Sequence, residues 1–364
     1  GDKVNILFYI SGYDGCGYYR VQVAAKYLNK NPNVFAKIST AYSNEEINWA
    51  DIVVLQKQSN PKALSYIEYA RSIGKKIVTE VDDDYFNIPE WNPAHKSYKG
   101  KENDLISFYE KSDAITVTTD HLSEQLSKYS KTYTLPNSLD YKLLDSFETM
   151  PEEVLNKYTK FLDCEQKKLS SNSVREFLKD KIVIGWGGSP SHLKDLEQAT
   201  PAVLKLCSEN KNVVLMMIGC TTQVILEEMI KKHSNQLILV EPIPIFGYPQ
   251  ALRSLNWDIG ICPIEDNLFN RSKSNLKFLE FSSNGFACVC SNVENYKKTV
   301  INGETGLLVN NSDQSWYEAL KKLVENENLR KDMAKKAKLF VRENYSMEKN
   351  VELWLNAYTE IIKK

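Results

Sequence analysis

Short apolar runs alternate with amphipathic segments along the whole chain. The amphipathic segments repeat their apolar positions at helical spacing, which is the pattern of parallel strands joined by crossover helices. The sequence therefore predicts an α/β fold with two doubly wound, Rossmann-like parallel sheets. The expected strands are residues 4–10, 35–40, 51–56, 76–81, 114–119 and 132–136 in the first half, and 181–186, 213–219, 237–241, 257–264 and 286–291 in the second.

A polar segment at residues 141–180 separates the two series of strands. It is rich in Lys, Glu, Ser and Asn and lacks β patterning, so we expect a partly helical connection there. It would join an N-terminal domain, residues 1–140, to a C-terminal domain, residues 181–345. Residues 346–364 predict an amphipathic helix that packs back on the first domain. We expect the domains to face each other across a cleft, with ligands at the carboxyl ends of the strands.

Charge and cysteine content narrow the function classes. The chain has 46 basic and 47 acidic side chains, so no general field attracts nucleic acid, and phosphate binding has to be local. Seven cysteines without metal spacing indicate buried free thiols in a reducing cytosol. We expect no leader and no membrane-spanning segment, because no apolar run approaches roughly 18 residues. We expect a cytoplasmic protein, with peripheral contact at the inner face of a membrane left open.

Three cations crowd the expected start of a helix in the stretch FNRSKSNLKFLE, residues 269–280. Arg271, Lys273 and Lys277 there oppose the helix dipole by about 0.3–1 kcal/mol each. An anion would relieve that repulsion, and the free backbone N–H groups of a helix start would hydrogen-bond it. This pattern favours a diphosphate site.

The same helix has a carboxylate one turn further on, Glu280, which is suited to the vicinal hydroxyls of a ribose. Ser272 or Ser274 is available as the helix cap. A solvated helix face with a Lys277–Glu280 pair explains the charges equally well, so both interpretations stay open.

Two glycine-rich loops follow expected strands. In SGYDGCGYYR, Gly15 and Gly17 let backbone approach a ligand, although a plain tight turn fits equally well. In GGSPSHLKDLE, Ser189 or Ser191 is an expected cap, and Lys194 places a second cation near a helix start. That second cation strengthens the phosphate hypothesis.

Three consecutive carboxylates, Asp82, Asp83 and Asp84, end the strand at 76–81. They suit a divalent metal site, an acceptor site in which a carboxylate orients or deprotonates a hydroxyl, or a turn whose backbone N–H groups they cap. These three interpretations stay open at this point.

Taken together, these motifs resemble a GT-B glycosyltransferase of the retaining family 4 type, in particular its bacterial surface-polysaccharide branch. The resemblance covers nearly the whole chain. The stretches that resemble this family are EDNLFNRSKSNLKFLEFSSNGFACVCS, GETGLLV, IGWGGSPSHLKDL, LPNSLD, GCGYYR and EVDDDYFNIP.

The resemblance implies transfer of a sugar, with retention, from a nucleoside-diphosphate sugar to a hydroxyl of a glycan, glycolipid or glycoprotein. The second domain would hold the donor, with a UDP-sugar expected in preference to a GDP-sugar, and the first domain the acceptor. No cofactor and no metal are expected, because lysines and helix ends would stabilise the leaving diphosphate.

The resemblance also assigns roles to residues. Lys277 matches the family's diphosphate lysine, and Glu280 matches its ribose carboxylate. The family's glutamate eight positions earlier is replaced by Ser272, for which Asp266 or Asn270 is expected to substitute. The expected donor-binding residues are Gly15, Gly17, Ser189, Lys194, Arg271, Lys273, Lys277 and Glu280, and the expected catalytic, acceptor-positioning residues are Asp82, Asp83 and Asp84.

Two other function classes remain as alternatives. A sugar-nucleotide 2-epimerase would use the same fold and would act on the donor alone. A non-catalytic partner of another transferase would bind the nucleotide sugar without turnover, and Ser272 in place of a glutamate favours this alternative.

Overall fold

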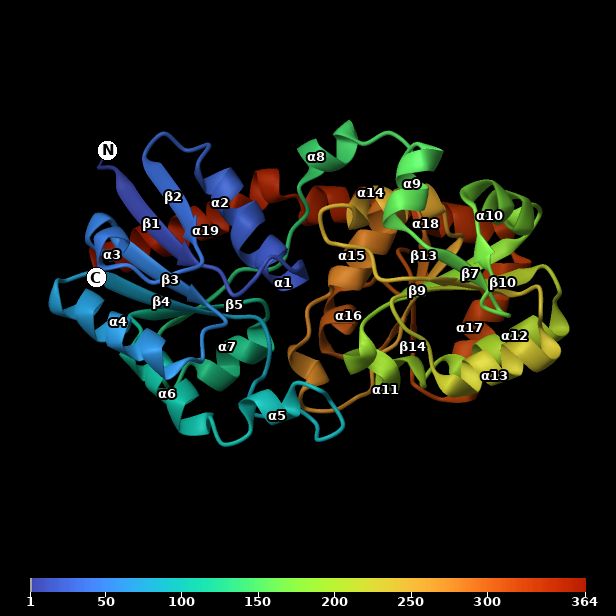
Figure 1. Ribbon diagram of the computed structural model, residues 1–364, viewed down its shortest axis with the longest axis horizontal. Coiled ribbons are helices and arrows are strands. Elements are labelled where there is room, and N and C mark those ends of the chain that lie inside the picture. Colours follow the sequence, from blue (N-terminus) through green and yellow to red (C-terminus); the bar gives the residue numbers. More distant parts are fainter. Residues whose placement is uncertain (1) are drawn as a thin grey trace. The chain divides into compact units, whose positions relative to one another are not determined.

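The computed structural model describes residues 2–364, which form two compact α/β units (Figure 1). The first unit contains the residues up to Tyr141, a short segment at 271–274, and the C-terminal residues 345–364. The second unit contains residues 142–270 and 275–344.

The first unit is built on a six-stranded parallel sheet in the order β2-β1-β3-β4-β5-β6. The chain adds β2 on one side of β1 and β3 on the other, so the strand order reverses between β1 and β3. Ligands of open α/β sheets bind at such a reversal, outside the carboxyl ends of the strands. The strands are β1 (Val4–Tyr9), β2 (Val34–Ser39), β3 (Ile52–Gln56), β4 (Lys76–Val81), β5 (Ala114–Val117) and β6 (Thr132–Thr134).

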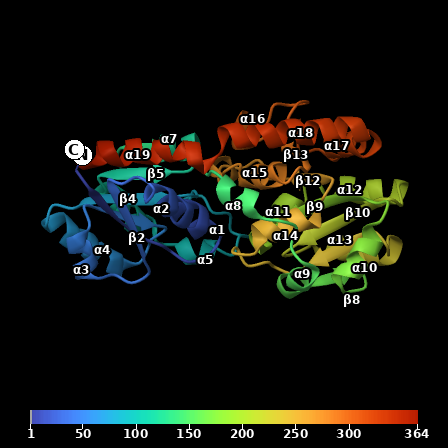
Figure 2. The same cartoon turned by 90° about the horizontal axis from the view of Figure 1, so that it is seen from above.

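The helices of this unit cover both faces of its sheet, and the last of them comes from the end of the chain (Figure 2). Helix α19 packs on α2, and Tyr358 meets the ring of Phe8 edge-on at 6.2 Å. The helices are α1 (Gly15–Gly17), the π-helical turn Tyr18–Gln22, α2 (Val23–Leu28), α3 (Asn44–Trp49), α4 (Pro61–Ser72), α5 (His95–Tyr98), α6 (Glu102–Lys111), α7 (Asp120–Leu126) and α19 (Met347–Lys363).

The second unit has an eight-stranded sheet in the order β14-β13-β12-β9-β10-β11-β7-β8. The six strands from β14 to β11 are parallel, and β9 and β12 flank the point where the order reverses. The strands are β7 (Phe161–Asp163), β8 (Lys168–Leu169), β9 (Ile182–Gly187), β10 (Val213–Ile218), β11 (Leu237–Val240), β12 (Ile259–Cys262), β13 (Ala287–Ser291) and β14 (Leu307–Val309).

Helices α12, α13, α17 and α18 share one core cluster with alternate residues of the central strands of this sheet. The helices of the unit are α8 (Tyr141–Ser146), α9 (Glu152–Tyr158), α10 (Ser171–Leu178), α11 (Leu193–Leu196), α12 (Thr200–Glu209), α13 (Gln223–Lys232), α14 (Tyr248–Leu255), α15 (Leu276–Ser283), α16 (Glu294–Thr299), α17 (Asp313–Glu325) and α18 (Glu327–Asn344), with 3₁₀ turns at Pro190–His192 and Asn270–Ser272.

A pair of glycines lets aromatic side chains pack on the opposite face of this sheet. Gly185 of β9 and Gly260 of β12 are register partners. A Cβ on Gly185 would lie 1.9 Å from the ring of Trp257, and one on Gly260 would lie 2.7 Å from Phe281. The two glycines therefore make room for the ring pair, whose centroids are 5.3 Å apart.

The α/β class and the eleven expected strands are confirmed, but three short strands were not predicted. The polar segment 141–180 was expected to lack strands, yet it contributes β7 and β8 as an antiparallel ribbon on the edge of the second sheet. Among the residues that the structure describes, every helix is too short or too polar to cross a bilayer.

The start of α15 differs from the prediction. The helix begins at Leu276 behind Asn275, whose side chain makes no capping hydrogen bond, so the expectation that Ser272 or Ser274 caps it is wrong. The serines lie in a preceding turn, where the Ser272 carbonyl accepts a hydrogen bond from Thr119 and the Ser274 hydroxyl from Asn137.

A buried ion pair ties the first sheet to the π-helical turn Tyr18–Gln22, and its arginine lies against α19. Arg20 donates to Glu80 of β4, to the carbonyl of Leu135 and to Asn137. Its guanidinium lies 5.7 Å from the ring centroid of Trp354. Arg20 is 1% exposed and Glu80 is 3% exposed, so water solvates neither charge.

We expect Arg20→Met to destabilise the protein by roughly 3–5 kcal/mol, because Glu80 becomes a buried carboxylate without its cation. Urea denaturation at pH 7 measures this loss. Arg20→Met combined with Glu80→Gln removes the stranded charge and is expected to recover more than half of it. The control is Arg71→Met, which removes an exposed arginine of α4. A loss below 1 kcal/mol for Arg20→Met would contradict this account.

Candidate functional site

The first turn of α15 places Lys277 at the carboxyl end of β9, beside the reversal in strand order. Its ammonium donates to the carbonyl of Gly187 and lies 5.4 Å from the ring centroid of Trp186. Burial lowers the pKa of Lys277, because a desolvated ammonium is costly. An anion placed beside this ammonium would offset that cost.

Two glycines, Gly188 and Gly219, lie at the strand ends near Lys277. A Cβ on Gly188 would lie 2.7 Å from the ring of Trp186, and a Cβ on Gly219 would lie 2.3 Å from the carbonyl oxygen of Gly188. Gly219 has a φ of +96°, which glycine adopts without strain. The ends of β9 and β10 therefore approach each other closely.

Two polar side chains, Tyr248 and Glu280, lie near Lys277 at the end of β9. The hydroxyl of Tyr248 lies 3.5 Å from the position that a Cβ on Gly187 would occupy. Glu280 lies one turn after Lys277 in α15, and its charge acts on both Lys277 and Tyr248. Lys277 and Glu280, which the sequence pairs by spacing, are thus close together in the structure.

Asp195 of α11 holds the loop after β12 and was not predicted. One of its oxygens accepts from the backbone N–H of Glu265 at 2.8 Å and from the Asn270 amide at 2.9 Å. The other lies 3.1 Å from Nδ1 of His192. Since Asn270 is 3% exposed and its amide also donates to a loop carbonyl, the structure uses this side chain to shape the loop.

The neighbouring candidates Lys194 and Ser189 lie on the surface of this unit. Lys194 faces Glu197 at 3.6 Å, with about half of each side chain exposed. The hydroxyls of Ser189 and Ser191 lie 2.6 Å apart, and Ser189 begins the 3₁₀ turn without a capping bond. These positions remain predictions as donor contacts.

The other two cations of the stretch 269–280 lie outside the helix. Arg271 and Lys273 belong to the segment 271–274, which is part of the first unit. The ammonium of Lys273 pairs with Asp83 at 2.9 Å. Lys277 is therefore the one of the three that α15 contains, and Lys273 lies with the acidic loop after β4.

The three consecutive aspartates of that loop have different partners. Asp82 accepts from the Tyr85 hydroxyl at 2.6 Å, whereas Asp83 pairs with Lys273. Asp84 accepts from the backbone N–H of Phe86 at 3.1 Å, and also from the Asn87 and Gln125 amides. Asp84 is thus the turn cap that the sequence left as one alternative.

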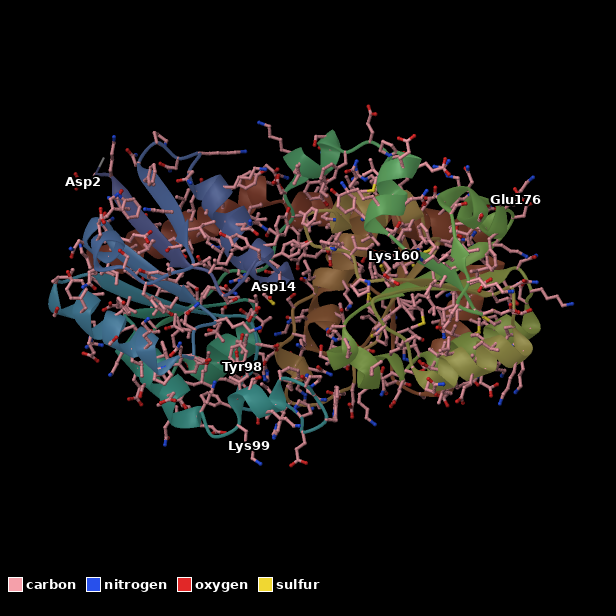
Figure 3. All side chains as sticks on the ribbon, viewed as in Figure 1. Asp2, Asp14, Tyr98, Lys99, Lys160 and Glu176 are labelled. Atoms are coloured by element: carbon pink, nitrogen blue, oxygen red, sulfur yellow. The ribbon has the colours of Figure 1, made fainter. Side chains whose placement is uncertain are left out.

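Asp82 belongs to a charged cluster at the carboxyl ends of β1, β3 and β4. The Cys16 thiol hydrogen-bonds to Asp82, and the charge of Lys57 acts on it. Lys57 has a φ of +54°, an uncommon conformation for a lysine that points to a functional position. Tyr98, labelled in Figure 3, stacks on Tyr85 with ring centroids 4.6 Å apart.

The charges in this cluster adjust one another. Burial alone would raise the pKa of Asp82, but the Lys57 ammonium and the hydrogen bonds outweigh burial and lower it. Burial alone would lower the pKa of Lys57, but Asp82 together with Cys16, Tyr98 and Asp14 outweighs burial, and the pKa is raised. The carboxylate of Asp82 is therefore ionised at neutral pH and can accept a hydrogen bond from a substrate hydroxyl.

Sequence reasoning missed Lys57, Cys16 and Tyr98. They come from three separate segments, α1, the residue after β3 and the end of α5, and only the tertiary structure brings them to Asp82. A lysine directly after a buried strand was the one available signal, and alone it does not distinguish Lys57 from other lysines.

The glycines after β1 have different surroundings. A Cβ on Gly17 would lie 1.9 Å from the carbonyl oxygen of Gly12, so Gly17 is needed for the packing of its own loop. Asp14 caps this turn by accepting from the Gly17 N–H at 2.9 Å. A Cβ on Gly15 would meet nothing within 4 Å, so a ligand has room there.

In residues 2–364, no group of three or more His, Cys, Asp or Glu side chains is arranged to hold a metal ion. All seven cysteines are free, and five of them are buried, as their scattered spacing predicted.

A family model supplies the assignment for this half of the chain. Residues 167–340 match the model described as glycosyl transferases group 1. Residues 167–340, the group 1 segment, are therefore similar to the group 1 glycosyl transferases. The group 1 segment includes Lys277, Glu280 and Asp195.

One curated relative is also described as a glycosyltransferase. The chain is 34% identical over 79 residues to an uncharacterized glycosyltransferase of Methanocaldococcus jannaschii, a match that covers 21% of this chain and 20% of that protein. The aligned part thus spans about a fifth of this curated relative.

Solved structures show the fold of the whole chain. A glycosyltransferase from Rickettsia africae ESF-5 is 17% identical, with a TM-score of 0.69 and all of both chains covered. Anabaena Alr3699/HepE in complex with UDP-glucose is 11% identical, with a TM-score of 0.67, and the match covers 98% of this chain and 100% of that one. Sucrose-phosphate synthase from Thermosynechococcus elongatus is 11% identical, with a TM-score of 0.66 and 99% of both chains covered. The chain therefore has the GT-B fold.

We expect Lys57→Met to destabilise the protein by about 1–2 kcal/mol at pH 7.5, because Asp82 loses the ammonium that offsets its burial. The loss is expected to shrink toward pH 4. Without Lys57 burial raises the pKa of Asp82, so protonation relieves the buried carboxylate of the variant as the pH falls. In the wild type the pKa of Asp82 lies below its ordinary value, so this carboxylate stays ionised and keeps its stabilisation over the same range. Thermal melts between pH 4 and 7.5 measure the difference.

The control is Lys62→Met, which removes an exposed lysine of α4 and is expected to change stability little at any pH. A stability difference between wild type and Lys57→Met that is constant across this pH range would show that Asp82 does not depend on Lys57.

Proposed function

We propose that the chain is a glycosyltransferase that moves a sugar from a nucleoside-diphosphate sugar to a hydroxyl of a glycan, glycolipid or glycoprotein, with retention of anomeric configuration. The observation that supports this most is the partly buried ammonium of Lys277 at the carboxyl end of β9, with Glu280 one turn away. A diphosphate next to Lys277 would gain a charge-assisted hydrogen bond, and the ribose hydroxyls would reach Glu280.

In this proposal Lys277 acts on the leaving group. When the glycosidic bond to the diphosphate breaks, negative charge grows on the phosphate oxygen, and an ammonium already in place stabilises it. Because the diphosphate oxygen accepts the proton of the attacking hydroxyl, no protein nucleophile is needed. Asp82 orients that hydroxyl. Asp83 contributes to the acceptor site through its ion pair with Lys273.

The loop after β11 is proposed to hold the nucleobase. Phe246 in this loop is 71% exposed, and its ring meets Tyr158 edge-on at 5.5 Å. Two residues later, Tyr248 borders Gly187. An exposed aromatic ring close to the diphosphate position is suited to stacking on a base. Uracil is the base we propose, and the HepE structures with UDP and with UDP-glucose support it.

We expect Lys277→Met to weaken UDP binding at least 100-fold without lowering the melting temperature, because removing a desolvated charge relieves a cost in the free protein. Isothermal titration calorimetry with UDP and with UDP- and GDP-sugars measures this. The control is Lys297→Met, an exposed lysine of α16, which is expected to bind like the wild type. Near-normal UDP affinity in Lys277→Met would reject the proposed diphosphate site.

The same titration has a pH dependence. The bound diphosphate favours the charged form of Lys277, whose pKa burial lowers in the free protein. UDP affinity is therefore expected to fall as the pH rises through that lowered pKa, with uptake of a proton on binding. Titrations in buffers of different ionisation enthalpy detect the proton.

The proposal also excludes a required metal, since Lys277 and backbone N–H groups stabilise the leaving group. Transfer is expected to continue in about 10 mM EDTA. A concentration of this order is enough to remove a bound divalent ion. Product analysis by NMR distinguishes transfer from 2-epimerisation, which changes the donor without an acceptor. Loss of activity in EDTA that Mg²⁺ or Mn²⁺ restores would assign the acidic loop to a metal instead.

A further inference from the structure

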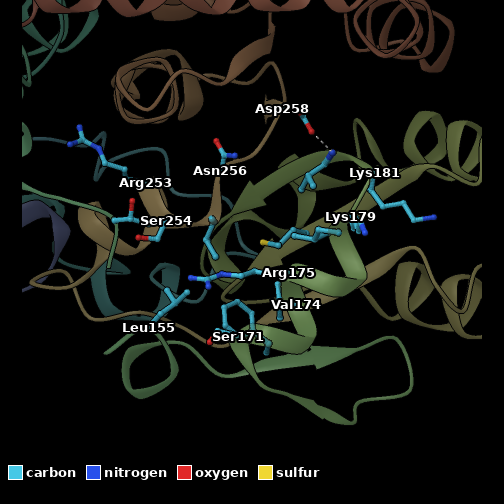
Figure 4. A pocket seen from close by; sticks show the side chains of 16 residues that line it. Leu155, Ser171, Val174, Arg175, Lys179, Lys181, Arg253, Ser254, Asn256 and Asp258 are labelled. Atoms are coloured by element: carbon cyan, nitrogen blue, oxygen red, sulfur yellow. Dashed lines mark hydrogen bonds between the residues drawn. The ribbon is translucent and has the colours of Figure 1, made fainter. Parts of the chain in front are cut away.

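A cavity of about 570 Å³ lies in the second unit, at the amino ends of its central strands (Figure 4). Lys181 and Asp258, which line it, directly precede β9 and β12. Lys277 contacts the opposite end of β9, so the cavity is separate from the proposed donor site. Its volume is within the range of about 300–1,000 Å³ that small-molecule sites occupy.

Six apolar side chains line the interior of the cavity, beside polar groups that form the rest of its surface. They come from α9, β7, α10, β9, β10 and the end of α14, and each is at most 6% exposed. They are Leu155, Phe161, Val174, Val183, Met216 and Leu255.

The rim of the cavity is cationic. Arg175, Lys179, Lys181 and Arg253 line it against a single carboxylate, Asp258. Asp258 accepts the backbone N–H of Val183 at 2.8 Å, and burial raises its pKa. Within the part of the chain that the structure describes, Arg175, Lys179 and Lys181 form no ion pair.

Hydrogen bonds hold the walls in place. The Ser254 hydroxyl at the end of α14 accepts the backbone N–H of Met150 at 2.8 Å. The backbone N–H of Ser171 at the start of α10 donates to Asn156 of α9 at 2.9 Å. Arg253 donates to the carbonyls of Leu144 and Phe147 and fastens the preceding segment. Hydrogen bonds between neighbouring segments therefore fix the walls of this cavity.

We propose that this cavity binds an amphiphilic anion, with its hydrocarbon chain on the apolar interior and its phosphate or carboxylate head at Arg175 and Lys179. A hydrocarbon chain gains from leaving water only if the site is apolar, and an anionic head gains only if cations border it. This cavity combines both properties. The proposal is independent of the glycosyltransferase function.

The test uses octyl phosphate below its micelle concentration, with octyl glucoside and inorganic phosphate as the neutral amphiphile and the head group alone. Calorimetry on the full chain is expected to show octyl phosphate binding at least tenfold tighter than either of the other two. Arg175→Ala with Lys179→Ala is expected to weaken it at least tenfold. The control double variant, Lys231→Ala with Lys322→Ala, removes two exposed lysines of the same unit and is expected to bind normally.

Equal binding of octyl glucoside would overturn the role of the cationic rim, and equal binding of inorganic phosphate would overturn that of the apolar interior. Unchanged octyl phosphate affinity in the Arg175/Lys179 variant, or no binding at all, would overturn the site itself. Lys277→Met is expected to keep octyl phosphate binding, so failure of the donor site and failure of this site are distinguishable.

A vesicle arm separates two sources of the amphiphile. Sedimentation with phosphatidylglycerol vesicles, compared with phosphatidylcholine vesicles, supports a membrane lipid if binding depends on Arg175 and Lys179. Octyl phosphate binding without vesicle binding supports a free soluble amphiphile.

Discussion

The cost of taking an ammonium out of water governs the candidate site of the second unit. Lys277 is held at the end of β9 by the Gly187 carbonyl, above a tryptophan ring that is itself fully buried. A carbonyl and a ring face offset part of the lost hydration, and the lowered pKa of Lys277 shows that they do not offset all of it. The folded protein thus keeps a charge in a state that a diphosphate would improve.

Two lysines at strand ends illustrate the difference between a charge neutralised within the protein and one suited to a ligand. The pKa of Lys57 is raised because Asp82 and the other groups around it together outweigh burial, and that of Lys277 is lowered because burial dominates. In the proposed function, the carboxylate of the first unit would orient the acceptor hydroxyl, and the ammonium of the second unit would stabilise the leaving diphosphate.

Most of the framework was predictable from the sequence, and the failures have physical causes. Strands such as β9 and β10 are buried on both faces, so they read as continuous apolar runs. The strands β7, β8 and β14 have two or three residues each, too few for a pattern, and β8 is a partly solvated edge strand. The helix start at 276 was missed because the nearby serines bond to other segments.

Site residues were predictable only where one segment contains the whole signal. Lys277 and Glu280 lie one helical turn apart, so spacing alone pairs them. The cluster of Asp82, Lys57 and Cys16 joins loops after three strands, and tertiary structure alone creates it. Lys273 looked like a partner of Lys277 because of its position in the sequence, but it pairs with Asp83.

The first unit includes residues 345–364, which lie after the whole of the second unit in the sequence. On the ribosome, where domains usually fold in the order of synthesis at about 5–20 residues per second, the second unit is complete before α19 emerges. Until then the apolar faces of α2 and β1 that α19 covers are bare, and a nascent chain in this state is a natural client for a chaperone. The order of synthesis therefore reverses the order of completion: the part that is made first becomes native last.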